Sequence, residues 1–118
     1  MDEKSLKDYI PLKEEVKHLE QLRASIQKEV EDEVKRGYIR KASESSFTAI
    51  LDYYDKLIAK HRAELQAVEE AINALPDWAR ELLELRYIKG KSWDAMTFET
   101  YYSLTSLHRL HRKALALL

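Results

Sequence analysis

Two long stripes of apolar residues run through the first two thirds of the chain. The first stripe has steps of mostly three and four residues on a charged background and comprises Leu12, Val16, Leu19, Ile26, Val30 and Val34. The second alternates steps of four and three without a break and comprises Phe47, Leu51, Tyr54, Ile58, His61, Leu65, Val68, Ile72 and Leu75. Steps of this kind place residues on one face of an α-helix, and the second stripe has the heptad spacing of helices that pair lengthwise. The pattern therefore predicts two long amphipathic helices.

A short polar segment separates the two stripes. Within "RGYIRKASESS", Gly37 can end the first helix and the serines offer N-caps for the second, while Pro11 suits the first turn of the first helix. A second helix from Ser46 to Ala74 would be roughly 43 Å long, so it must pack along its length. The short loop favours an antiparallel hairpin within one chain, but a second copy of the protein could supply the partner helix equally well. We expect the intramolecular hairpin together with added contacts in a homodimer.

The spacing changes after residue 75. Pro76 ends the long helix, and Asp77 is a candidate N-cap for a helix over "DWARELLELRYIK". Gly90 is expected to stop this helix. Its apolar face is predicted to comprise Trp78, Leu82, Leu85 and Ile88.

Two further helices are predicted near the end. Ser92 begins a very short helix, "SWDAM", and after the connection "TFETYY" Ser103 is a good N-cap for the final helix. The buried face of that final helix is predicted to comprise Leu107, Leu110, Ala114 and Leu118. A helix of about five residues is not stable alone, so Trp93 and Met96 are expected to hold "SWDAM" in place by packing against the neighbouring helices.

Composition and charge divide the chain in two. Only two Gly and two Pro occur among 118 residues, which favours helix nearly everywhere. We therefore predict an all-α protein with a long, coiled-coil-like antiparallel helical hairpin in residues 1–75, for oligomerisation or partner binding, and a helix-turn-helix domain in residues 76–118. The net charge of −1 conceals an asymmetry, because the first part carries 13 bases and 16 acids and the second carries 7 and 5. Any contact with a polyanion is expected in the second part.

The final helix has the properties that a DNA-reading helix requires, namely a capped start, an apolar back and a front without acids. Ser and Thr can contact base edges, and Arg can bind guanine or phosphate. The competing interpretation is a small three-helix core whose last helix happens to be basic, because cations near a helix C-terminus also interact favourably with the helix dipole. The candidate DNA-binding residues are Thr105, Ser106, His108, Arg109, Arg112 and Lys113.

A resemblance favours the DNA-binding interpretation. The stretch "LLELRYIKGKSWDAM" followed by "YYSLTSLHRLHRKALALL" resembles region four of sigma-70-type factors and, more closely, small phage-encoded regulators related to the ArpU-type late-transcription activators. The resemblance is strong over residues 78–118 and only architectural over residues 12–75. Two positions depart from the pattern, because Tyr101 stands where the turn usually has Gly and Thr97 where the first helix usually has a small residue. The matching positions are Leu85, Arg86, Tyr87, Gly90, Ser92, Trp93, Met96, Ser103, Arg109, His111, Ala114 and Leu115.

The resemblance implies a phage or prophage transcriptional regulator, acting in the cytoplasm of a bacterial host, that binds double-stranded promoter DNA through the sigma-like helix-turn-helix. The near-neutral charge keeps a second interpretation open: a protein-interaction module that uses the same fold to bind RNA polymerase or a host regulator without sequence-specific DNA binding. A purely structural coiled-coil protein is a third interpretation.

Other chemistries find little support in the sequence. His108 and His111 lie three residues apart but lack a third nearby ligand, so neither a metal nor a cofactor is expected. There is no Cys and no Gly-rich phosphate loop, and the run "EVEDEVKR" is typical of an exposed helix with ion pairs, so we do not expect an enzyme. His61 is interpreted as a polar residue within the second stripe. No apolar run approaches the ~18 residues of a membrane span, which favours a soluble protein without a membrane partner.

Overall fold

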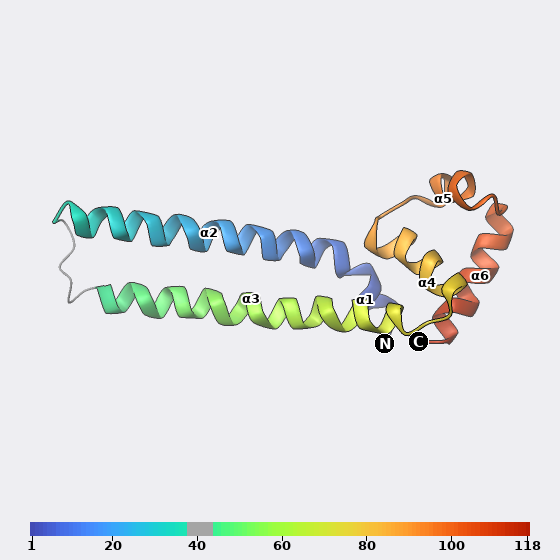
Figure 1. The fold of residues 1–118 in the computed structure, drawn as a ribbon, viewed down its shortest axis with the longest axis horizontal. Helices are drawn as coiled ribbons and strands as arrows, with labels where there is room; N and C mark the ends of the chain where they lie inside the picture. The colour runs from blue at the N-terminus through green and yellow to red at the C-terminus, as the bar shows by residue number, and fades with distance from the viewer. Residues whose placement is uncertain (38–43) are drawn as a thin grey trace. The chain divides into compact units, whose positions relative to one another are not determined.

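Helices account for all regular structure in the residues that the computed structural model describes, which are 1–37 and 44–118. The predicted all-α class is therefore confirmed for this part of the chain. No helix within it is both long enough and apolar enough to cross a membrane. The helices (Figure 1) are α1 (Glu3–Lys7), α2 (Tyr9–Lys35), α3 (Glu44–Asn73), α4 (Asp77–Leu83), a wide π-helical turn (Glu84–Ile88) that continues α4, α5 (Trp93–Thr100) and α6 (Leu104–Ala116).

Packing divides the chain into two compact units. One consists of residues 13–63, and the other combines residues 1–12 with residues 64–118. Both α2 and α3 therefore contribute to each unit. The predicted boundary between residues 75 and 76 marks where the sequence pattern changes, and it stays a prediction about domain organisation. The serine-rich loop predicted after Gly37 falls mainly on residues 38–43, which lie outside the described residues.

In the unit of residues 13–63, α2 and α3 run antiparallel and are joined by ion pairs. Glu20 pairs with Arg62, and Arg23 Nε lies 2.5 Å from Asp55 Oδ1. As the residue number rises along α2, the number of its partner on α3 falls, which is the pattern of antiparallel helices. Both apolar stripes lie on the less exposed faces of their helices. Within this unit Val16, Leu19, Val30 and Ile58 are buried, and Ile26, Val34, Phe47, Leu51, Tyr54 and His61 are partly buried. The added dimer contacts stay a prediction.

The start of the chain contributes to the second unit in a way that the sequence analysis missed. Asp2 caps α1 by accepting a hydrogen bond from the Ser5 N–H (2.9 Å), and Leu6 and Tyr9 are fully buried. The Tyr9 hydroxyl donates a hydrogen bond to the Glu69 carboxylate on α3. Burial, followed by the bond to this carboxylate, raises the pKa of Tyr9 to about 12. Residues 1–10 show no apolar stripe, because only two of their side chains enter the core.

The helix predicted after Pro76 forms, but its buried face differs from the predicted one. Of the predicted face, Leu82 is buried, Leu85 and Ile88 are partly buried, and Trp78 is 42% exposed. Beyond Leu83 the face changes because of the wide turn, in which the Lys89 N–H donates to the Glu84 carbonyl five residues back (2.8 Å). One extra residue per turn rotates the following side chains by roughly 100°. Ala79, Leu82 and Leu83 are buried before the turn, and Tyr87 is buried within it.

The ends of α4 and its π-helical turn follow the prediction only in part. Asp77 is not the N-cap of α4, because Pro76 occupies the cap position and Asp77 is the first helical residue, paired with Arg80 at 2.9 Å. Gly90 does follow the turn, with a φ of 68°. A Cβ at this position would lie 2.8 Å from Ile10 Cδ1, the end of a side chain that can shift, so the left-handed backbone is the main requirement for glycine.

Two predicted N-caps are confirmed, and α5 is longer than predicted. Ser92 and Ser103 accept hydrogen bonds from the third residue after each of them. The segment "TFET" continues α5 instead of forming part of the connection, so the helix has eight residues. Thr97 and Thr100 direct their hydroxyls to carbonyls of the same helix, at 2.6 Å and 2.7 Å, which keeps both compatible with it. Tyr101 then ends α5.

Ile58 provides the test of the pairing between α2 and α3. Replacing Ile58 with Asp puts an unpaired carboxylate into an apolar contact and is expected to reduce the free energy of unfolding by roughly 2–5 kcal/mol. Ala59→Asp makes a similar change at the neighbouring exposed position and is expected to cost less than about 1 kcal/mol. Denaturant unfolding followed by circular dichroism measures both. Equal stability of the two variants would show that Ile58 is not a core residue.

Candidate nucleic-acid interface

The final helix, α6, packs through one face and exposes its cations on the opposite one. Leu107, His111 and Ala114 are buried, and Leu110 and Leu118 are partly buried against the same core. At roughly 100° per residue, Thr105, Arg109 and Arg112 point away from this face. All three are exposed, and residues 103–118 contain no acid. The exposed face can therefore approach a polyanion without repulsion from its own helix.

The six candidate residues fall into two groups. Ser106 is partly buried and belongs to the N-cap, because its N–H donates to Ser103 Oγ (3.2 Å) and the two hydroxyls lie 3.0 Å apart. His108 is partly buried, with its ring centre 4.6 Å from that of Trp93. The other four are exposed along α6: Thr105, Arg109, Arg112 and Lys113. We call these four the cationic face.

Trp93 connects α5 to both α6 and the wide turn. Its ring centre lies 5.0 Å from that of His111, and the Arg86 guanidinium lies 4.7 Å from the Trp93 ring. Arg86 Nη1 also donates to the Lys91 carbonyl at 2.9 Å. Trp93 is partly buried and packs against the core, as predicted, while Met96 is completely buried. These contacts fix the position of α5 relative to α6.

His111 and Tyr87 form a buried polar contact between α6 and the wide turn. The Tyr87 hydroxyl and His111 Nε2 share a hydrogen bond of 2.6 Å. Burial lowers the pKa of His111 below its ordinary value of 6.5, partly opposed by Glu3 and assisted by Arg86, His108 and Lys7. Burial likewise raises the pKa of Tyr87. Both groups are therefore held neutral near pH 7. In the sequence, His111 stands out only as a weak metal ligand and as a match to the pattern, so spacing alone does not indicate this packing role.

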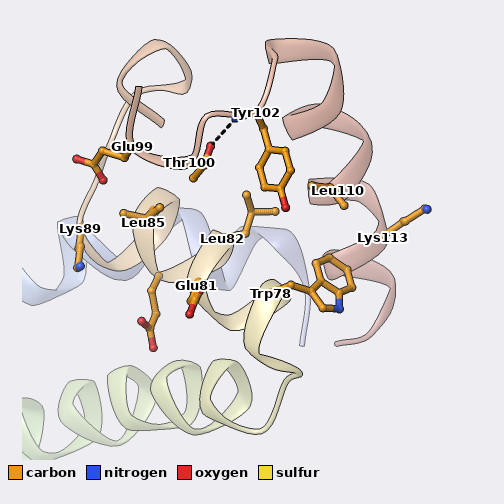
Figure 2. Close-up of a pocket in the computed structure, with 11 residues that line it drawn as sticks. Trp78, Glu81, Leu82, Leu85, Lys89, Glu99, Thr100, Tyr102, Leu110 and Lys113 are labelled. Carbon is orange, nitrogen blue, oxygen red and sulfur yellow. Dashed lines mark hydrogen bonds between the residues drawn. The ribbon is translucent and has the colours of Figure 1, made fainter. Parts of the chain in front are cut away.

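A pocket of about 750 Å³ opens between α4 and α6 beside Lys113 (Figure 2). Trp78, Leu82 and Leu110 form much of its apolar wall. Its charged lining includes three carboxylates and two ammonium groups, so it does not extend the cationic face. These charged residues are Glu81, Glu84, Lys89, Glu99 and Lys113. Helical spacing assigns Trp78 to the core, so the sequence does not indicate the pocket.

The two histidines of α6 do not gather metal ligands around them. The His108 ring contacts the Trp93 ring at a tilted angle, and His111 bonds to Tyr87. Across residues 1–37 and 44–118 there is no group of three or more His, Cys, Asp or Glu residues that could hold a metal ion.

Comparison of the chain with protein-family models, curated proteins and solved structures finds no match. The geometry of α5 and α6 is consequently the basis for the function proposed below.

Trp93→Ala tests whether the aromatic cluster positions α6. The variant removes contacts to Arg86, His108 and His111 and is expected to cost roughly 2–3 kcal/mol of stability, less than a fully buried Trp because Trp93 is only partly buried. Trp78→Ala is the matched control at an exposed tryptophan of the same unit and is expected to cost about 1 kcal/mol or less. Chemical denaturation measures both. A Trp93→Ala variant as stable as the parent would show that the cluster is not structural.

His111 predicts a specific dependence of stability on pH. Its pKa is lowered in the folded state, so below about pH 6.5 the unfolded chain takes up a proton that the folded chain does not. Stability is therefore expected to fall as pH drops from about 6.5 towards the lowered pKa, and His111→Gln is expected to flatten this slope. His18→Gln, at an exposed position of α2, should leave the slope unchanged. Identical slopes for the parent and His111→Gln would contradict the assignment.

Proposed function

We propose that the protein is a transcriptional regulator of phage or prophage origin that binds double-stranded promoter DNA in the cytoplasm of a bacterial host. In this proposal α5 and α6 act as a helix-turn-helix of the sigma region-four kind, with α6 as the reading helix. The observation that carries the proposal is the cationic face, on which Arg109, Arg112 and Lys113 are exposed on a helix without acids. A surface of this kind favours phosphate groups over any uncharged partner.

The dimensions and chemistry of α6 suit the major groove. Its 13 residues span roughly 20 Å, and a groove about 12 Å wide admits an α-helix. Thr105 lies in the first turn, where a reading helix meets base edges. Arg109 can bind guanine or phosphate, and Arg112 and Lys113 can bind phosphate. Ser106 and His108 contribute through helix capping and stacking more than through direct contact, because both are partly buried.

Residues 1–75 would serve to pair two copies or to contact the transcription machinery. Three cations per copy are few for a DNA-binding surface, and a homodimer would double the number of phosphate contacts. Sequence-specific binding by two α6 helices would then require two half-sites separated by whole turns of the duplex.

The second candidate function is a protein-interaction module that binds RNA polymerase or a host regulator. The pocket between α4 and α6 favours it, because apolar walls with both charge signs at the rim suit a side chain of a partner protein. This function requires neither Arg109 nor Arg112.

Salt dependence separates the two candidates. Binding of random-sequence DNA duplexes should weaken steeply as salt rises, and Arg109→Ala or Arg112→Ala should reduce affinity and decrease the slope of log K against log salt by about 1. Arg36→Ala, which removes an exposed arginine at the end of α2, is the matched control and should bind like the parent. Gel-shift titration at several salt concentrations provides the measurement. Failure to form any complex at low salt would favour the interaction module.

A further inference from the structure

Large apolar side chains are exposed in and beside the turn between α5 and α6, and we call Phe98, Tyr101 and Leu104 the turn patch. Phe98 is 80% exposed, Tyr101 92% and Leu104 43%. Neighbouring Tyr102 is 50% exposed, and it differs from these three because it lines the pocket beside Leu82 and Leu110 (Figure 2). The turn patch therefore adds little to the packing of the unit, although it consists of the residue types that normally supply a core.

The backbone conformation of Tyr101 is unfavourable, and contacts of its side chain within the unit do not offset this. It is the one non-glycine residue with positive φ (62°) in the described parts of the chain. Its N–H bonds to the Thr97 carbonyl and ends α5, a role that glycine fills without steric penalty. A Cβ in this conformation is unfavourable, and a side chain exposed to this degree offers few compensating contacts. A tyrosine here is consistent with a contact outside the chain.

The surroundings of the turn patch indicate the chemistry of that contact. Leu104 is the first residue of α6 and directly precedes Thr105 of the cationic face. Glu99, the acid nearest to the turn in sequence, is paired with Lys91 at 3.4 Å. The turn patch thus includes the first residue of the helix that carries the cationic face. On a duplex, the apolar group next to the phosphates and base edges of the major groove is the C5 methyl of thymine.

We propose that the turn patch contacts thymine methyl groups, with Leu104 and Tyr101 making the contact, so that the protein selects duplexes with thymine at the edge of its site. The proposal rests on the DNA-binding function proposed above and deepens it. A leucine at the start of a reading helix cannot hydrogen-bond to a base, but it can cover a methyl group and exclude water from it.

The test compares thymine with deoxyuridine, which lacks only the C5 methyl. A duplex enriched by the parent protein from a random-sequence pool is synthesised once with thymine and once with deoxyuridine throughout. The parent is expected to bind the deoxyuridine duplex about fourfold more weakly for each covered methyl. Leu104→Ala is expected to lose the part of this preference that Leu104 supplies and to keep the part that Tyr101 supplies. Leu117→Ala makes the same change at a 51% exposed position beyond the other end of α6 and should keep the parent's preference.

Tyr101→Gly provides a second, independent measurement. Glycine relieves the left-handed backbone, so the variant is expected to melt at a higher temperature than the parent. It is also expected to bind the thymine duplex more weakly, because the aromatic ring is gone. A Tyr101 that served only to shape the turn would instead leave DNA affinity unchanged or improved as stability rises.

The possible failures are distinguishable. Equal affinity of the parent for the two duplexes, in a complex that keeps its salt dependence, would overturn the thymine contact and leave the DNA-binding function standing. A thymine preference that is undiminished in both Leu104→Ala and Tyr101→Gly would assign the preference to other residues and the turn patch to a protein partner. Absence of any DNA complex at low salt would overturn both proposals.

Discussion

The packing of α6 depends on the wide turn at Glu84–Ile88. In a regular helix continuing from Ala79 and Leu83, Arg86 would face the core and Tyr87 would lie at its edge. The extra residue of the π-helical turn exchanges the two, so that Tyr87 bonds to His111 and Arg86 reaches the Trp93 ring. One local change in helix geometry thus removes a guanidinium from the core and supplies the buried partner that α6 requires.

Through these contacts, α6 serves as a core element and a candidate binding surface at the same time. Leu107 and Ala114 are completely buried, whereas Arg109 and Arg112 are exposed. Because one helix carries both sets, any change in its packing also moves the cationic face. His108 belongs to the packing of α6, since its ring contacts Trp93, the residue that fixes α5.

At the turn before α6, a bulky and exposed side chain occupies an unfavourable backbone conformation. Elsewhere in this unit the strained or crowded position is occupied by the residue that fits best, as at Gly90, where a Cβ would meet Ile10. At Tyr101 the chain keeps a bulky side chain on a left-handed backbone. Stability lost at one exposed turn is characteristic of a residue retained for a contact with another molecule.

The sequence by itself determined the elements whose cause is local. Spacing placed both long stripes on the less exposed faces of α2 and α3, and the hydroxyls of Ser92 and Ser103 begin α5 and α6 as predicted, because periodicity and capping act within a few residues. Only the tertiary structure decided that Trp78 is exposed, that Leu6 and Tyr9 are buried, and that His108 and Ser106 support α6 more than they extend the cationic face. Each of these outcomes depends on side chains brought together from distant parts of the chain or on one irregular turn. Long-range contacts and an irregular turn do not produce a periodic pattern of apolar residues in the sequence.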